Sequence, residues 1–252
     1  MTSRQTSIKR FLTLSVLFLA FFSCDKEETS EEDMQQTDQE DTSTFPTPND
    51  ADGVLVAVKS VSITDSPLGP IEIQLGTAVG VFTEDGFTSD EFISAGMVSC
   101  NGSELAINAN NAYTFTDITP TDPTGLDFND EIEWNVTGAN GIANLNYNAD
   151  MIGFPSVTSI TSSELVDKED GHTLTCDNVS AADSVIFLIG GVTKTLSGNA
   201  NSCSFTADEL TEIGTGANIA QIAAYVADPV DFGTTRIYFV NEYVQSQSVT
   251  VE

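Results

Sequence analysis

The 252-residue chain has little of what most catalytic and nucleic-acid-binding sites require. It contains one histidine, His172, so it can form neither a histidine-activated nucleophile nor a histidine-rich zinc site. It has no glycine-rich phosphate loop of the P-loop or Rossmann type. Eight lysines and arginines stand against 38 aspartates and glutamates, and the net charge of −30 repels nucleic-acid phosphates. We therefore predict a protein that is not an enzyme, binds no nucleic acid and needs no cofactor.

The chain also lacks an apolar run long enough to cross a bilayer. Its main apolar run, residues 11–22, is shorter than the roughly 20 residues that a membrane-spanning helix needs. Three basic residues and no acid precede it, namely Arg4, Lys9 and Arg10. A positive segment followed by a short apolar segment is typical of a secretory signal peptide. We predict that residues 1–23 are such a signal and are removed.

Cys24 follows the small residue Ser23 at the end of the apolar run. This arrangement resembles the lipobox of bacterial lipoproteins, in which the cysteine is lipidated and becomes the mature N-terminus. The resemblance implies that Cys24 carries several acyl chains. At about 0.8 kcal/mol for each buried CH₂, more than one chain gives stable membrane anchoring.

Residues 24–28 read Cys-Asp-Lys-Glu-Glu. This run resembles the lipoprotein export signal of Bacteroidetes, a cysteine and one further residue followed by lysine and two acids. The export signal would consist of Lys26, Glu27 and Glu28. The resemblance covers residues 1–28 and implies a lipid-anchored protein on the outer face of the outer membrane. Asp25 would instead mean inner-membrane retention under the enterobacterial rule, but the fuller match favours the cell surface.

A strongly acidic segment separates this signal from the rest of the chain. Residues 25–49 are rich in Glu, Asp, Thr, Ser and Gln and contain almost no apolar side chains. Too little surface can be buried there to offset the entropy lost on ordering. We predict that residues 24–51 are a disordered tether, whose end-to-end span as a coil is about 30 Å.

The body of the chain, residues 52–252, lacks helical periodicity. Short β-branched runs recur between turn signals, as in all-β proteins. In residues 71–75 isoleucine and leucine alternate with glutamate and glutamine, which predicts a strand. Asn101-Gly102 predicts a tight hairpin, because a type I′ turn needs positive φ at both central residues. The pattern predicts an all-β fold.

A phenylalanine–proline pair at residues 154–155 marks the expected boundary within the body. About seven predicted strands follow it in under a hundred residues, the dimensions of an immunoglobulin-like sandwich. We predict two tandem β-sandwich domains over residues 52–153 and 154–252. A single helical turn is expected between residues 206 and 213, with Thr206 or Asp208 as its cap.

Three cysteines remain if Cys24 is lipidated: Cys100, Cys176 and Cys203. Cys176 and Cys203 share strand parity with apolar neighbours, so both are expected to face the second core. One alternative is a disulfide between them, which the outside of the cell permits. The other is that all three are buried free thiols that pack as small apolar groups.

Few residues suggest a ligand site. Trp134, the single tryptophan, alternates in phase with apolar neighbours and is predicted to lie in the core, whereas Tyr225 is out of phase and is predicted to be exposed. The acidic loops at residues 84–86 and 122–131 offer oxygen ligands for a structural calcium ion, but neither has EF-hand spacing. Ordinary acidic loops are the alternative.

Together these features favour a lipid-anchored, non-catalytic binding or scaffold protein on the cell surface. Its partners would be the outer membrane, through the lipid, and a glycan or protein ligand. One alternative is a glycan-binding accessory protein, because the layout resembles the accessory lipoproteins of polysaccharide-utilisation systems. Another is a pilin-like subunit that polymerises by strand exchange, for which residues 236–240 are a candidate strand. The body carries no motif that assigns it to a family.

Overall fold

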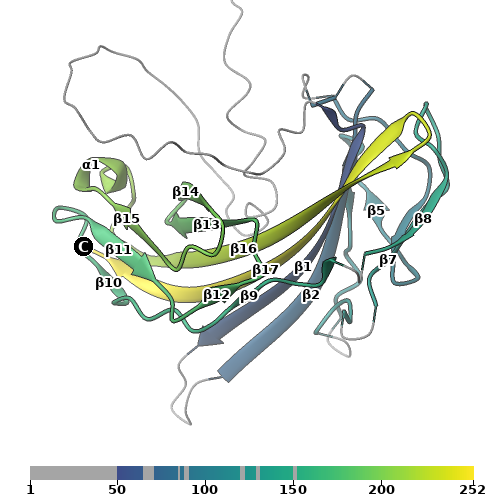
Figure 1. The fold of residues 1–252 in the computed structure, drawn as a ribbon. Helices are drawn as coiled ribbons and strands as arrows, with labels where there is room; N and C mark the ends of the chain where they lie inside the picture. Colours follow the sequence, from purple (N-terminus) through teal and green to yellow (C-terminus); the bar gives the residue numbers. More distant parts are fainter. Residues whose placement is uncertain are drawn as a thin grey trace, which may run out of the picture.

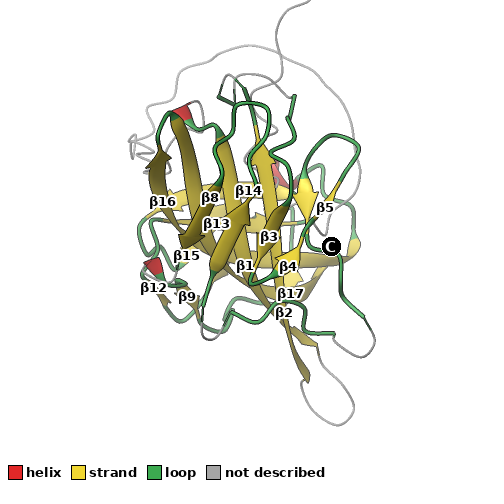
Figure 2. Ribbon diagram, turned by 90° about the vertical axis from the view of Figure 1, so that its right-hand side faces the viewer, coloured by secondary structure: helices red, strands yellow, loops and turns green. Residues whose placement is uncertain are grey.

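The computed structural model of the chain describes residues 50–64, 71–84, 86–87, 91–119, 123–128, 131–149 and 152–252. The described part is almost entirely β-structure (Figure 2). Its one α-helix is α1 (Ala207–Leu210). The predicted all-β class is therefore confirmed. No helix within these residues is long and apolar enough to span a membrane.

A long curved sheet runs the length of the molecule (Figure 1). Among the described residues nine strands belong to it. Eight follow the order β14 (Val192–Ser197), β13 (Ser184–Ile189), β16 (Gly216–Phe232), β17 (Thr235–Val251), β1 (Gly53–Thr64), β2 (Ile71–Phe82), β6 (Tyr113–Thr114) and β5 (Ala106–Ile107), and β10 (Leu165–Val166) pairs with the end of β17. β1 lies parallel to β17 and antiparallel to β2. The first and last parts of the body thus pair at the centre of the sheet.

Two predicted strands are longer in the structure. The strand predicted at residues 71–75 continues to Phe82 as β2, and the candidate strand at residues 236–240 is part of β17, which continues to Val251. Directly after the predicted stretch, Gly76 of β2 pairs with the loop that contains Leu126. A Cβ at Gly76 would lie 1.8 Å from the carbonyl oxygen of Leu126. The glycine therefore permits a close approach of two backbones and does not end the strand.

Short strands pack at both ends of the long sheet. The N-terminal lobe (residues 91–149) contains a four-stranded sheet in the order β4 (Ser103–Glu104), β3 (Val98–Cys100), β7 (Glu133–Val136), β8 (Leu145–Asn148). The C-terminal lobe (residues 156–213) contains α1 and the pairs β9 (Ser156–Val157) with β12 (Val179–Ser180) and β11 (His172–Thr175) with β15 (Ser202–Phe205). β7 and β8 lie at one end of the curved sheet, and β11, β15 and α1 lie at the other (Figure 1).

Each lobe packs on the same face of the long sheet, which we call the core face. The cluster under the N-terminal lobe contains the fully buried Trp134, as predicted, together with Phe239 of β17. The cluster under the C-terminal lobe contains Ile222 of β16 and Val249 of β17. β17 therefore supplies both clusters, and the two lobes share one sheet across the predicted boundary at residues 153–154.

The opposite face of the long sheet carries a third apolar cluster. In the described part of the chain its members all come from the sheet itself, namely Val54, Val56, Val58, Val79, Ile186, Leu188, Ala223, Tyr225, Ala227, Val240 and Val244. Tyr225 is 3% exposed, so the prediction that it lies at the surface is wrong. Tyr225 does project away from Ile222, as the alternation indicated. However, the sheet is apolar on both faces here, and alternation does not predict burial on a two-sided strand.

The local signals for a hairpin and a helix start are confirmed. Asn101 and Gly102 have φ values of 47° and 75° and connect β3 with β4. Thr206 is the N-cap of α1 and forms a capping box with Glu209. Glu209 also forms an ion pair of 2.7 Å with Lys194, which joins α1 to β14.

The first described residues form an ion pair and hydrogen bonds with the tip of the β16–β17 hairpin. The Asp50 carboxylate lies 3.0 Å from a guanidinium nitrogen of Arg236 and 2.8 Å from the Tyr238 hydroxyl. The Asp52 carboxylate accepts a hydrogen bond of 2.7 Å from the backbone N–H of Arg236. The segment that precedes Asp50 therefore joins the body at this tip.

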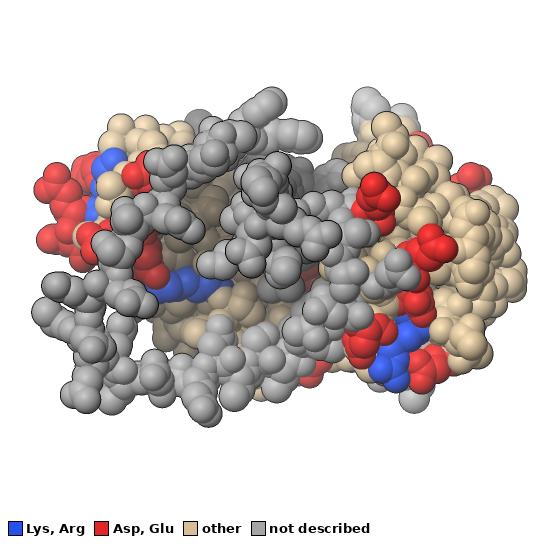
Figure 3. Space-filling model, turned by 90° about the horizontal axis from the view of Figure 1, so that it is seen from above, with Lys and Arg blue, Asp and Glu red and all other residues tan. Residues whose placement is uncertain are grey.

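Acidic side chains outnumber basic ones at both ends of the face shown in Figure 3.

Candidate ligand-binding cleft

A cleft lies on the core face between the two lobes. Its floor consists of the parallel strands β1 and β17, whose register puts these side chains next to each other: Lys59 with Tyr243, Val61 with Gln245, and Ile63 with Gln247. Because every second residue of a strand faces the same side, these six side chains form two adjacent rows of three on the core face. Two adjoining pockets of about 390 and 400 Å³ open onto this floor.

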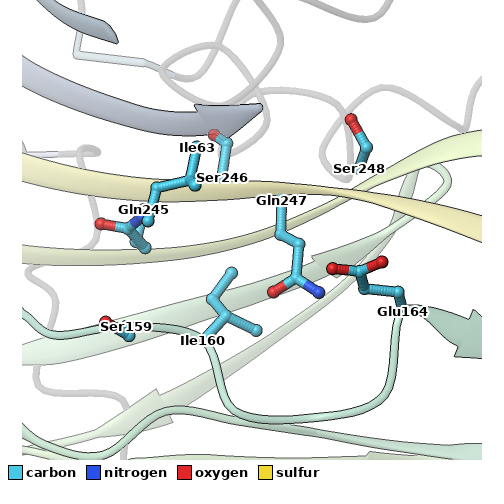
Figure 4. A pocket seen from close by; sticks show the side chains of 8 residues that line it. All are labelled: Ile63, Ser159, Ile160, Glu164, Gln245, Ser246, Gln247 and Ser248. Carbon is cyan, nitrogen blue, oxygen red and sulfur yellow. The ribbon is translucent and has the colours of Figure 1, made fainter. Parts of the chain in front are cut away.

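The pocket next to the C-terminal lobe takes its wall from the segment before β10 (Figure 4). Gln247 points from β17 into the space between Ile160 and Glu164. Ser246 and Ser248 point to the other side of the strand. The pocket thus presents an amide and a carboxylate beside an apolar side chain, a combination that can orient a polar ligand.

Gln245 is a polar residue for which the fold gives no structural reason. It lines this pocket, and although the residue as a whole is 4% exposed, its side-chain nitrogen and oxygen are not among the fully buried polar atoms that lack a partner. Gln221 on the opposite face is buried to a similar extent, and its amide donates a hydrogen bond of 2.9 Å to Ser246 Oγ. No such side-chain contact holds the amide of Gln245 to a described residue, and its polar atoms face the pocket. Gln245 is therefore a group available to a ligand.

The other pocket lies against the N-terminal lobe. The ammonium nitrogen of Lys59 lies 4.5 Å from the centroid of the Phe154 ring. Burial lowers the pKa of Lys59, while the negative charge of Asp127 acts in the opposite direction. Burial raises the pKa of Tyr243, and the nearby Glu72 carboxylate adds to this effect. This end of the cleft offers one cation and one protonated phenol.

The groups along the cleft suit recognition of a polar ligand. The floor presents two amides and a phenol, with the charged groups Lys59 and Glu164 near its two ends. Amides donate and accept hydrogen bonds in pairs, so they match hydroxyl or amide groups of a ligand. In the ranges that the structure describes, no three or more His, Cys, Asp or Glu side chains gather as metal ligands.

The residues predicted to anchor the protein are Cys24, Lys26, Glu27 and Glu28, and all four lie outside the described residues. The lipid anchor and the export signal therefore stay predictions. The acidic loops at 84–86 and 122–131 each include residues outside the described part, so calcium binding also stays untested. Residues 236–240, the candidate for strand exchange, lie within β17 and pair with β16 on one side and β1 on the other.

The cysteines of the C-terminal lobe lie in its core, as predicted, but as free thiols. Cys203 pairs with Leu174 in the register of β11 and β15, whereas the N–H of Cys176 bonds to Asn201. Cys176 and Cys203 are thus displaced along the two strands, and each thiol contacts a backbone carbonyl. The structure contains no disulfide between them. Cys100 is also a buried free thiol.

Sequence reasoning did not single out Gln245, Gln247 or Glu164. The available signal was the run at residues 245–248, Gln-Ser-Gln-Ser, which interrupts the apolar alternation of β17 between Val244 and Val249. By itself such an interruption indicates a break between two strands. In the structure the strand continues, and the polar run coincides with the part of the core face between the lobes.

Comparisons with known proteins do not assign the chain to a family. No family model matches it, and no curated protein matches it. One solved structure, reported as "structural insight into host cell surface retention of a 1.5-MDa bacterial ice-binding adhesin", is 16% identical with a TM-score of 0.23. The match covers 78% of this chain, and this chain spans 65% of the length of that one. A likeness at this TM-score carries no argument about function.

Proposed function

We propose that this chain is a lipid-anchored, non-catalytic protein of the outer face of the outer membrane that binds a ligand in the cleft between its lobes. The anchor is proposed from the signal at residues 1–28, with Cys24 as the lipidated residue. Binding is proposed from one structural observation. The side chains of Gln245 and Gln247 line one pocket together with Glu164, and the amide of Gln245 is not held by a hydrogen bond to another described side chain.

A purely structural role does not explain this polar floor. Beneath the lobes the core face is mostly apolar, and the lobes gain their stability by covering it. The buried polar Asn241 there donates hydrogen bonds to the carbonyls of Ala149 and Gly153. Between the lobes the side chains on β17 are Tyr243, Gln245 and Gln247, and the two glutamines have no such hydrogen bond to the described backbone of a lobe. Residues that lower the stability of the fold at one place on its surface are typical of a binding site.

Ligand binding is tested with the chain from residue 24 onward, carrying Cys24→Ser, on arrays of glycans and of peptides. We expect saturable binding that Gln245→Met weakens at least about tenfold, because the ligand loses its hydrogen bonds to the amide in the pocket. Thr193→Val, an exposed change on β14, is the matched control and should bind as the parent does. If Gln245→Met binds equally well, the cleft is not the site.

The anchor is tested separately in cells of a Bacteroidetes host. Cys24→Ala should abolish incorporation of labelled palmitate and release the protein from the membrane fraction. Protease added to intact cells should degrade the anchored parent protein. A Cys24→Ala protein that still partitions with membranes would contradict the lipid anchor, and protection from protease would indicate that the body faces the periplasm.

The favoured ligand class is a neutral glycan. Its hydroxyl groups match the amides of Gln245 and Gln247, and the ring of Tyr243 offers a flat apolar surface beside them. A hit confined to neutral polysaccharides, lost in Gln245→Met, would support this candidate. Binding of peptides alone would contradict it while leaving the cleft as the site.

A further inference from the structure

Among the described residues, the outer edge of strand β2 has no pairing strand over its first five residues. Val79 and Gly80 pair with β6, and Gly76 bonds to the loop at residues 123–128. No described strand pairs with Ile71–Leu75 on the side away from β1. In this region β1 and β2 extend beyond the neighbouring strands (Figures 1 and 2). The backbone N–H and C=O groups of this edge are therefore available to another strand.

This edge has few of the features with which proteins usually prevent edge-to-edge pairing. Such edges commonly carry charged side chains, above all lysine, or a proline or a bulge, and residues 71–75 carry the single charge of Glu72. Residues 71–75 contain no lysine or proline, and their register with β1 is continuous. Ile71 and Ile73 project to the same face and are 53% and 52% exposed. A regular strand with an exposed apolar row is suited to pair with a partner strand.

We propose that this edge pairs antiparallel with the same edge of a second copy, so that the long sheets of two chains continue into each other in a symmetric dimer. The register is centred on Ile73, which lies opposite the partner's Ile73. Ile71 then faces the partner's Leu75, and Glu72 faces the partner's Gln74. Each carboxylate meets an amide. The same contact exists within one chain, where Gln74 Nε2 donates a hydrogen bond of 2.6 Å to Glu72 Oε1.

The neighbouring registers are less favourable. Centring the pair on Glu72 would bring two carboxylates opposite each other, which is destabilising. Centring it on Gln74 would require the backbone of Gly76, which already bonds to Thr124 and Leu126. The register centred on Ile73 uses the free residues alone. A net charge of −30 on each chain opposes association, so the dimer should become tighter as salt screens this repulsion.

Sedimentation equilibrium of the chain from residue 24, with Cys24→Ser, tests the dimer over a range of concentration and salt. We expect a monomer–dimer equilibrium whose dissociation constant falls with ionic strength. Ile73→Lys should raise this constant at least about tenfold, because two apolar contacts are lost and two charges face each other. Ile107→Lys is the matched control, since Ile107 is 51% exposed on another edge strand, β5, and should dimerise as the parent does.

Disulfide trapping tests the register itself. Directly opposed residues of antiparallel strands have Cα atoms about 4.5–5.5 Å apart, within the range of a disulfide. Ile73→Cys should therefore form a covalent dimer on air oxidation, and Ile107→Cys should not. The proposal is overturned by a chain that is monomeric at every concentration and salt, by dimers that Ile73→Lys leaves intact, or by equal trapping at both positions. A monomer that instead binds a strand of another protein would also overturn self-pairing.

Discussion

The hydroxyl of Tyr238 donates a hydrogen bond of 2.8 Å to the Asp50 carboxylate and so joins the first described residue to the central strand β17. Arg236 lies two residues earlier on the same strand, and its guanidinium nitrogen is 3.0 Å from an oxygen of the same Asp50 carboxylate. Burial raises the pKa of Tyr238 to about 12, and the hydrogen bond and charge of Asp50 act in the same direction. The start of the body is thus fixed to the sheet by a contact that requires a protonated phenol.

This contact predicts a loss of stability in alkali. The pKa of Tyr238 is about 12 in the folded protein and 10.0 in the unfolded chain. The contribution of the protonated phenol to stability is therefore complete below pH 10 and is lost as the pH rises through 12. Tyr238→Phe should lower the free energy of unfolding at pH 8 by about 1 kcal/mol and reduce its decline above pH 10. Tyr147, whose pKa is also raised to about 12, should preserve part of that decline. Urea titrations between pH 8 and 11 measure both effects, and equal slopes for parent and variant would contradict this account.

The shared sheet predicts that the two lobes unfold together. Leu210 is fully buried in the C-terminal lobe, and Leu210→Ala should cost about 2–5 kcal/mol. Trp134 lies in the N-terminal lobe and is the only tryptophan, so its fluorescence reports that lobe. We expect Leu210→Ala to move the urea midpoint of Trp134 fluorescence as far as that of far-UV circular dichroism. An unchanged fluorescence midpoint would mean that the lobes unfold independently.

The amide in the cleft predicts different effects of one substitution at two glutamines. Gln245→Met should leave the free energy of unfolding nearly unchanged, because the amide faces the pocket and no hydrogen bond to another described side chain is lost. Gln221→Met should lower it by about 1 kcal/mol, because the hydrogen bond to Ser246 is lost. Thermal unfolding of both variants gives the comparison. A Gln245→Met protein that is less stable than the Gln221→Met protein would show that the amide of Gln245 has a structural role.

The buried thiols predict a specific count of reactive cysteines. Burial raises the pKa of the thiols of Cys100, Cys176 and Cys203, so few thiolates form at neutral pH. Maleimide should label none of the three rapidly in the native protein and all three in denaturant. A protein lipidated at Cys24 should therefore take up three labels when unfolded, and an unprocessed Cys24 should add a fourth. Mass spectrometry counts them. Two missing labels that return on reduction would reveal a disulfide between Cys176 and Cys203.

Features that depend only on neighbouring residues could be predicted from the sequence. The Asn101-Gly102 hairpin follows from the positive φ values that both residues tolerate, and the cap of α1 follows from the side-chain oxygen of Thr206. The burial of Trp134 follows from its phase within one short strand. These signals are local, because a turn or a cap is formed within a few residues of the chain.

The tertiary structure alone decided which faces are covered and which strands meet. β1 pairs in parallel with β17, nearly two hundred residues later, and no local pattern specifies that register. Tyr225 is buried among apolar side chains on the second face of the sheet, and Gln245 lines a pocket whose wall comes from the segment before β10. Alternation along a strand reports which residues share a face. What covers that face depends on contacts between distant segments, and these form only when the chain folds.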